Sequence, residues 1–350
     1  METRKLYYED PFQKGFATTI VSCDAVKGGY AVVLAETAFY PEGGGQPYDT
    51  GVLGEANVLE VHEKNGVITH LCDKPFEVGK SVSGKIDWAR RFDHMQQHSG
   101  EHICSGLICE RFHCDNVGFH MGADVVTIDF NADISWDELM EIEQLANLYI
   151  YEDHPIDIQF YRGAELDKVE YRSKKPLEGD VRIVSFPGAD CCACCGTHVV
   201  RSGQVGLVKF LSVQKFRDGV RIELLSGKRA HRCLSECWAQ DVRIAQALSV
   251  KPNASFAGVE RVLAELSALK QRCAKLEESV FAQTAAQYEG KGDVLLFEDE
   301  MSGDSLRKLC DAVTNHCGGP REPLRRPLRG LCRRGRRVQV RHRAHRRRPS

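Results

Sequence analysis

The 350-residue sequence lacks any run of eighteen apolar residues, and its charged N-terminus is not followed by the apolar segment that a secretion signal needs. We therefore expect neither a membrane protein nor a secreted one, and the sequence predicts residence in the cytoplasm. Hydrophobic residues make up 42% of the chain and charged residues 27%. These proportions are typical of globular domains and exclude a fibre or a disordered tail.

Cysteine is not scarce, since the chain contains fifteen. In a short secreted chain this number would predict a disulfide framework. In a cytoplasmic protein of this length it indicates reduced thiols or metal ligands instead.

The first part of the chain predicts a β-rich subdomain, residues 1–87. Short runs of β-forming residues occur at 31–34, 58–61 and 67–71, and Asn65-Gly66 between the last two is typical of a type I′ hairpin. Residues 88–240 follow, with a helix expected from about 90 to 111, a strand over 125–130 and a helix over 136–151. Because strands and helices intermix without a regular βαβ repeat, the sequence predicts an α+β fold.

Apolar residues recur every three and four positions from Val259 to Val280, which is a heptad pattern lasting three repeats. It predicts a helical, coiled-coil-like spacer over residues 241–288. A helix packed on its own domain and a helix that pairs with a second copy, as a homodimer, fit this pattern equally well. A strand over 293–297 and a helix over 305–316 then begin a C-terminal α/β domain, residues 289–319, which we expect to be incomplete.

The composition changes at Gly319, and residues 320–350 contain thirteen Arg and one Glu with almost no strand or helix pattern. This tail predicts either a basic arm that binds nucleic acid or a shift of reading frame, and the break inside an unfinished domain favours the second interpretation. The whole chain has a net charge of −2, from 47 basic and 49 acidic residues. Without the tail 34 basic and 48 acidic residues remain, a charge of −14, so any nucleic acid must meet a local basic patch.

Two histidines four residues apart, His94 and His98, are expected on one face of the first long helix, within reach of one ion. Alone, such a pair is weak evidence for a metal. Met95 stands where metalloproteases carry a general-base Glu, which argues against a peptidase. His102 extends the series, but two helical turns, about 11–12 Å, keep it from sharing an ion with His94.

A cysteine-rich segment, residues 190–198, holds four thiols and the imidazole of His198 within nine residues. Packing does not explain such density beside a glycine and a histidine. Thiolate and imidazole are ligands that zinc prefers, and two donor pairs far apart in sequence can clamp an ion between two elements. The sequence therefore predicts a Zn²⁺ site, and the spacing leaves its sulfur ligand open among Cys191, Cys192, Cys194 and Cys195.

Five segments, taken in order, resemble the editing domain of alanyl-tRNA synthetase and its free-standing relatives. These are the loop 39–51 with its Gly-Gly-Gly-Gln, the His-x-x-x-His pair, the Cys-x-x-x-His of 194–198, Ser-Gly-Gln-Val-Gly at 202–206 and Gly-Val-Arg-Ile-Glu at 219–223. The resemblance spans about residues 8–227 and is with the long free-standing form, which has a helical extension and a C-terminal domain. Two departures are Met95-Gln-Gln97, where the synthetase has Thr-Ala-Thr, and Cys195, where it has glycine.

The resemblance implies hydrolysis of the ester that joins serine or glycine wrongly to tRNA for alanine, with the acceptor end of that tRNA as partner. It implies a zinc ion bound by Cys194 and by three histidines that form the catalytic set, His94, His98 and His198. Zinc would lower the pKa of a water and polarise the ester carbonyl.

The resemblance also implies a substrate-binding set. The amides of Gly43, Gly44 and Gly45 would hold the carbonyl or the terminal adenosine, because three glycines without Cβ atoms let backbone approach a ligand. Gln46 would read a serine hydroxyl. Local positive charges for tRNA contact would come from Arg90, Arg91, Lys209, Lys215, Arg217 and Arg221, of which Arg221 would contact the substrate.

Three other functions stay open from the sequence. Four protein ligands form a closed tetrahedral site, so zinc could stabilise a non-catalytic tRNA-binding module. Threonyl-tRNA synthetases share a related pair of motifs, so a different mischarged tRNA is a second alternative. A thiol hydrolase is the third and is disfavoured, because a zinc-bound thiolate is occupied.

Overall fold

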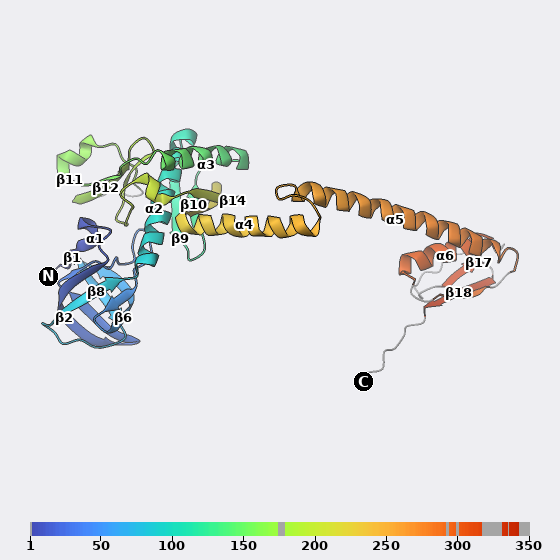
Figure 1. Cartoon of the computed structure of the whole chain (residues 1–350), viewed down its shortest axis with the longest axis horizontal. Helices are drawn as coiled ribbons and strands as arrows, with labels where there is room; N and C mark the ends of the chain where they lie inside the picture. The colour runs from blue at the N-terminus through green and yellow to red at the C-terminus, as the bar shows by residue number, and fades with distance from the viewer. Residues whose placement is uncertain are drawn as a thin grey trace. The chain divides into compact units, whose positions relative to one another are not determined.

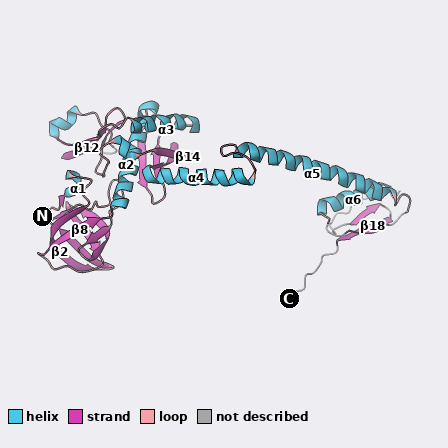
Figure 2. Ribbon diagram, in the orientation of Figure 1, coloured by secondary structure: helices cyan, strands magenta, loops and turns pink. Residues whose placement is uncertain are grey.

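The computed structural model describes residues 2–173, 179–291, 294–298, 301–316, 331–334 and 336–342. The chain divides into two compact units, Met1–Trp238 and Ala239–Ser350. Both contain helices and strands (Figure 1, Figure 2), which confirms the mixed α and β character expected from the sequence.

Six strands of the first unit close into a barrel in the order β2-β3-β7-β6-β5-β8, drawn in blue in Figure 1. Along β2, period-two alternation buries Phe16, Thr18 and Ile20 inside the barrel. The barrel strands are β2 (Gly15–Val26), β3 (Gly29–Leu34), β5 (Gly51–Leu53), β6 (Ala56–Lys64), β7 (Val67–Cys72) and β8 (Ser81–Ile86). Beside it lie β1 (Arg4–Lys5), α1 (Leu6–Glu9) and β4 (Glu36–Thr37).

The expected hairpin is confirmed, since β6 and β7 pair antiparallel across Asn65 and Gly66. Both turn residues have positive φ, 51° and 77°, which only a type I′ turn requires at both positions and which Asn and Gly tolerate best. This turn therefore sets the register in which β6 and β7 begin to pair.

The remainder of the first unit surrounds one long helix, α2 (Trp88–Phe112), with two sheets and a second helix. An antiparallel sheet has the order β14-β15-β10-β9, and a smaller one has the order β11-β12-β13. Their elements are β9 (Asn116–Met121), β10 (Val126–Phe130), α3 (Trp136–Tyr151), β11 (Asp157–Arg162), β12 (Asp180–Phe186), β13 (Asp190–Ala193), β14 (Val208–Phe216) and β15 (Gly219–Ser226). Two short 3₁₀ helices are η1 (Gly163–Lys168) and η2 (Ser202–Val205).

Local capping explains where the two expected helices begin. The Asp87 side chain accepts a hydrogen bond from the Arg90 amide at the start of α2, and α2 ends where His113 adopts the left-handed conformation. A capping box between Ser135 and Glu138 begins α3. The predicted helices near 90–111 and over 136–151 are therefore confirmed, as is the strand near 125–130.

Arg91 ties the first turn of α2 to the barrel. It is fully buried, its Nε lies 2.9 Å from Asp49 Oδ2, and its guanidinium also donates to the carbonyls of Ala38 and Pro11. Because the Arg91 guanidinium is buried and already donates to protein acceptors, a phosphate cannot reach it. The expectation that Arg91 contacts tRNA is therefore corrected, because burial and pairing with Asp49 occupy it.

The second unit is built on a helix of 32 residues, α5 (Ser255–Ala286), which follows α4 (Gly227–Ala247) along the chain. A small core, which includes Phe281, Leu309 and Val313, joins the end of α5 to α6 (Gly303–His316). A three-stranded sheet has the order β16-β18-β17, with β16 (Leu295–Glu298), β17 (Leu331–Arg334) and β18 (Arg336–His342). The helix expected over 305–316 is confirmed.

Two predictions made for the end of the chain can be compared with the structure of this unit. The strand expected over 293–297 appears as β16 from residue 295, while residue 293 lies outside the described residues. Residues 320–350 were expected to have almost no regular pattern, yet β17 and β18 form here because both pair within the sheet of β16. The other residues of that tail lie outside the described residues.

No helix in the described parts of the chain is long and apolar enough to cross a membrane.

Candidate metal centre and the cavity beside it

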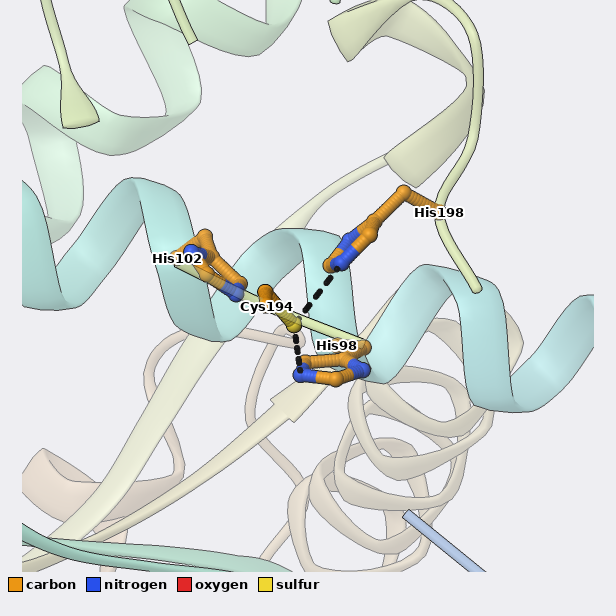
Figure 3. Close-up of side chains that lie close together, drawn as sticks. All are labelled: His98, His102, Cys194 and His198. Atoms are coloured by element: carbon orange, nitrogen blue, oxygen red, sulfur yellow. Dashed lines mark hydrogen bonds between the residues drawn. The ribbon is translucent and has the colours of Figure 1, made fainter. Parts of the chain in front are cut away.

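Four side chains from distant parts of the sequence converge on one point of the first unit. His98 and His102 come from α2, Cys194 follows β13 and His198 lies on the loop after it (Figure 3). One ligand atom of each lies within 4.8 Å of those of the others. His98 Nε2 is 3.5 Å and His198 Nε2 is 3.4 Å from Cys194 Sγ. Three imidazole nitrogens and a thiol at this spacing form a group able to hold a metal ion.

The other ring nitrogen of each histidine is held by an acceptor. His98 Nδ1 lies 2.9 Å from Gln46 Oε1, and His102 Nδ1 lies 2.8 Å from Asp190 Oδ2. His198 Nδ1 lies 3.2 Å from Ser99 Oγ. If each Nδ1 carries the proton and donates it to its acceptor, each Nε2 keeps a free electron pair on the side that faces Cys194. This outer set of acceptors is the arrangement that orients histidines in metal sites.

The charge of the sulfur also suits a cation. Burial acts to raise the pKa of the Cys194 thiol, but the facing imidazoles of His98 and His198 hold that pKa well below its usual value. The thiolate is the form that binds metals. The donor set therefore fits a metal ion in the placement of its four atoms and in the charge of its sulfur.

Asp190 has a supporting role next to this group. Its carboxylate receives two hydrogen bonds from Arg172, at 2.7 and 2.8 Å, besides the contact with His102. Burial opposes the charged form, but His102 and Arg172 together hold the pKa of Asp190 below its usual value. The carboxylate therefore stays ionised and fixes the His102 ring.

His94 does not belong to this group, although the sequence paired it with His98. It is buried one turn earlier on α2, and its Nδ1 has no hydrogen-bond partner among the described residues. Burial, and then the cations Arg90 and Arg229, lower the pKa of His94 to about 3. In its place stands His102, one turn beyond His98.

Two glycines explain why the cysteine segment meets the later pair. A Cβ at Gly106 would collide with the Ala189 carbonyl, and a Cβ at Gly196 would collide with the His98 ring. These close approaches place the cysteine segment over the second half of α2, level with His98 and His102. Two helical turns separate His102 from His94, and this distance rules out only an ion that these two residues share. His98 and His102 are also four residues apart, and this signal was available in the sequence.

Gln46 has a different position from the one expected. Its side chain is fully buried, its Nε2 donates to Thr197 Oγ1 and its Oε1 accepts from the Thr197 amide while facing His98. All of these contacts are with protein groups, and Gln46 does not border the cavity described below. It therefore links the glycine loop to the metal group and positions His98.

A cavity of about 420 Å³ opens beside the metal group. His98, His102 and Cys194 form part of its wall, so an ion on these ligands would face the space. The rest of the described wall consists of Gly44, Glu101, Asn116, Phe119, Arg172, Ser173, Asp180, Val181, Arg182, Cys192, Ala193 and Cys195. A metal-binding group that borders a cavity of this size can act on a bound molecule as well as hold the fold together.

The glycine loop reaches this cavity through one residue. Gly43 and Gln46 exchange backbone hydrogen bonds at 3.1 and 3.0 Å, which makes a tight turn with Gly44 and Gly45 at its tip. Gly44 borders the cavity, whereas Gly45 packs on the Phe119 ring so closely that no Cβ fits. Of the three glycines expected to meet substrate, only Gly44 is therefore in the wall.

Arg221 lies away from the cavity wall and pairs with Asp129 through two hydrogen bonds of 2.7 and 2.8 Å. Its guanidinium also sits 3.9 Å from the centre of the Phe216 ring. Its side chain is 41% exposed, so its outer face remains accessible. Lys209 pairs with Glu143 at 2.7 Å, so a neighbouring carboxylate neutralises its charge.

Comparison with known proteins places these features in a family. The model of the class II (A) tRNA synthetases matches residues 12–90, and that of the threonyl and alanyl tRNA synthetase second additional domain matches residues 181–223. The alanyl-tRNA editing protein AlaX-L of Pyrococcus horikoshii is 31% identical over 86% of this chain and 75% of its own length. The chain belongs to the alanyl-tRNA editing protein family. The family resemblance read from the sequence is therefore confirmed.

The chain is also similar to a second editing protein and to full-length alanine–tRNA ligases. The alanyl-tRNA editing protein Aarsd1-A of Xenopus laevis is 29% identical over 81% of this chain and 73% of its own length. The alanine–tRNA ligase of Pyrococcus abyssi is 36% identical over 89% of this chain. The chain spans about a third of the length of such ligases.

The geometry changes how the family's histidine motif fits this chain. Set on His98 and His102, the His-x-x-x-His pattern has Ser99, Gly100 and Glu101 between its histidines. Ser99 then faces His198, and Gly100 packs where a Cβ would strike Ser226. Sequence reasoning missed Ser99, Glu101, Asn116 and Asp190, since their roles depend on contacts made across the fold. It set His102 aside as a ligand although its spacing from His98 is visible in the sequence.

Proposed function

We propose that this protein is a trans-editing hydrolase that removes serine or glycine wrongly joined to tRNA for alanine. The observation that carries the proposal is the metal-binding group in the wall of a 420 Å³ cavity, in a chain of the alanyl-tRNA editing protein family. The names of the relatives point to alanyl-tRNA editing, and the cavity beside Cys194 gives an aminoacyl ester a place to bind. The choice of serine and glycine rests on the family resemblance.

The proposed metal is zinc, with His98, His102, Cys194 and His198 as ligands. One thiolate and three imidazole nitrogens are a donor set that suits zinc over harder ions such as Mg²⁺. The acceptors on each Nδ1 support this choice because they orient every Nε2 toward the same point. His94 is not part of the proposed set.

In the proposed reaction, bound zinc supplies a Lewis acid that polarises the ester carbonyl and makes a nearby water more acidic. The chain's own residues hold and screen the substrate. The tip of the glycine loop presents Gly44 to the cavity, where a backbone amide can donate to a developing oxyanion. Phe119, stacked on His98 with ring centres 5.1 Å apart, covers one side of the ligand ring and restricts water there.

A non-catalytic zinc-stabilised tRNA-binding module is the alternative, because four protein ligands form a closed site. The position of three of the four ligands, His98, His102 and Cys194, in a cavity wall favours the hydrolase. The match of residues 181–223 to a domain named for threonyl as well as alanyl tRNA synthetases keeps a threonine-system substrate as a second alternative. Each of these alternatives gives a different outcome in one assay.

That assay measures release of amino acid, with and without a zinc chelator, from tRNA for alanine charged with serine, glycine or alanine and from tRNA for threonine charged with serine. The proposal predicts cleavage of the first two esters, sparing of the third and loss of activity with chelator that added zinc restores. Binding of mischarged tRNA without cleavage would establish the non-catalytic alternative. Cleavage only of serine joined to tRNA for threonine would establish the threonine system.

The proposed partner is the acceptor end of tRNA, met in the cytoplasm, with exposed positions such as Arg221 as local positive charges. We also propose that α5 pairs with a second copy of the chain. Its apolar seam is exposed in the single chain, with Leu266 at 46%, Leu269 at 56% and Leu276 at 57% of their full accessibility. Such a row of leucines gains stability from a partner helix.

A further inference from the structure

Glu101 and Asn116 form a buried polar pair in the wall of the cavity, next to the metal group. The two side chains are 5% and 7% exposed. Asn116 Nδ2 donates to Glu101 Oε1 at 2.8 Å and to Ser105 Oγ at 2.9 Å, and Ser105 Oγ donates to Glu101 Oε1 at 2.6 Å. These bonds lie on one side of the pair and fix both side chains.

The other oxygen of each group is left without a hydrogen bond among the described residues. Asn116 Oδ1 is buried with no partner. His102 Nε2 lies 4.0 Å from Glu101 Oε2, which is beyond hydrogen-bond distance, and it belongs to the metal group. Buried acceptors, and a buried carboxylate above all, are costly unless a donor meets them. The buried Oδ1 of Asn116 and the unbonded Oε2 of the largely buried Glu101, both on residues that border the cavity, indicate a ligand that donates.

The nearby charges point to a cationic donor. Arg172 in the same wall is paired with Asp190, so it does not neutralise Glu101. Arg182 donates to the carbonyl of Cys194. Glu101 therefore borders the cavity with no cationic side chain hydrogen-bonded to its carboxyl group among the described residues.

We propose that Glu101 Oε2 and Asn116 Oδ1 form the subsite that binds the α-ammonium group of the aminoacyl ester. An ammonium group carries three N–H donors and a positive charge, so it satisfies both acceptors and the carboxylate at once. The α-ammonium lies one carbon from the ester carbonyl, and Glu101 precedes the proposed ligand His102 directly. Binding there holds the reacting carbonyl beside the metal group.

This subsite rests on the proposed deacylase function and adds a requirement to it, because the enzyme then selects esters of free amino acids over esters of hydroxy acids. Every aminoacyl group carries the α-ammonium, so the subsite recognises the class of substrate. The choice among amino acids must come from other groups in the wall.

The test compares two esters of tRNA for alanine that differ only at the α position. One carries serine, and the other carries the hydroxy acid in which a hydroxyl replaces the ammonium. We expect Glu101→Gln to lower kcat/KM for the seryl ester by about 10- to 100-fold, the range for a hydrogen bond to a charged group. For the hydroxy ester we expect a change no larger than about threefold. Glutamine keeps the shape and the Asn116 contact, and zinc content confirms an intact site.

Ser105→Ala is the matched control, because Ser105 contacts Glu101 Oε1 and does not border the cavity. It should change both esters equally. An equal loss for both esters in Glu101→Gln would overturn the proposal, since a structural or proton-transfer role does not depend on the α-ammonium. If the unmodified protein cleaves neither ester, the proposed function fails on its own.

If the Glu101→Gln variant does not fold, a binding measurement on the unmodified protein tests the proposal instead. The unmodified protein should bind 3′-deoxy-3′-(serylamino)adenosine, which cannot be hydrolysed as an ester, at least about tenfold more tightly than its hydroxy counterpart. Equal affinity for the two compounds would overturn the subsite. Unequal affinity without any ester cleavage would support the subsite and refute the deacylase.

Discussion

At the scale of single residues, the site depends on which nitrogen of each histidine is free. Gln46, Asp190 and Ser99 each occupy an Nδ1, and their combined effect is to turn three Nε2 atoms toward Cys194. His94 has no such partner on its Nδ1. A hydrogen-bond partner on Nδ1 therefore distinguishes the histidines of the metal group from His94.

Replacement of His102 and of His94 distinguishes the two candidate ligand sets. We expect His102→Ala to lower zinc affinity by more than the roughly 10- to 100-fold that loss of an outer-shell partner costs. His94→Gln should leave the zinc content of the purified protein at one ion per chain. Zinc content by atomic emission and affinity by chelator competition are the measurements. The opposite pattern would restore His94 to the ligand set.

Gln46→Ala tests the outer contact of His98. Because Gln46 holds His98 and Thr197 and does not border the cavity, we expect zinc affinity to fall about 10- to 100-fold. At saturating zinc, the rates for seryl and glycyl esters should fall by the same factor. A selective loss of the seryl ester, with zinc affinity unchanged, would show instead that Gln46 reads the serine hydroxyl.

At the scale of elements, the barrel contains its own buried histidine, remote from the metal group in sequence and contacts. His70 on β7 is fully buried, with Nε2 2.9 Å from Thr37 Oγ1 and Nδ1 3.1 Å from the Val32 carbonyl. Burial lowers the pKa of His70 to about 4. The imidazole is therefore neutral in the folded barrel at neutral pH.

His70 predicts acid sensitivity of the barrel. Unfolding lets the ring take up a proton between pH 4 and its unfolded pKa of about 6.5. The penalty for burying the neutral ring is thus absent above about pH 6.5, grows as the pH falls from 6.5 to 4 and is fully developed below pH 4. Between pH 7 and pH 5 it should cost about 2 kcal/mol.

The measurement is urea unfolding of the whole chain at pH 5 and pH 7, followed by a probe in the barrel. His70→Gln should be less stable at pH 7 but should lose about 2 kcal/mol less than the unmodified protein on going to pH 5. His62→Gln is the control, because His62 lies on the outside of β6. Equal losses for all three proteins would contradict the assignment.

At the scale of the whole molecule, each compact unit has its own core, and α5 carries an apolar seam that its own unit leaves exposed. Leu266→Glu should raise the dissociation constant of the proposed homodimer by at least about tenfold, since it removes two buried leucines per dimer. Lys270→Glu, at an exposed position off the seam, should leave it unchanged. Sedimentation equilibrium of the full chain measures both, and a monomeric unmodified protein would refute the pairing.

The sequence by itself determined the features that depend on neighbours in the chain. The hairpin at Asn65 and Gly66, the starts of α2 and α3 and the cysteine-rich segment follow from turn chemistry, capping and composition. Family membership also followed from the sequence, because it depends on the order of short motifs.

Only the tertiary structure decided which residues of those motifs meet. Helical spacing places His94, His98 and His102 on one face and does not distinguish between the two neighbouring pairs. The choice comes from Gly106 and Gly196, whose missing side chains let the cysteine segment approach the later half of α2. The open acceptors of Glu101 and Asn116 arise in the same way, because a cavity exists only where distant elements fail to fill the space between them.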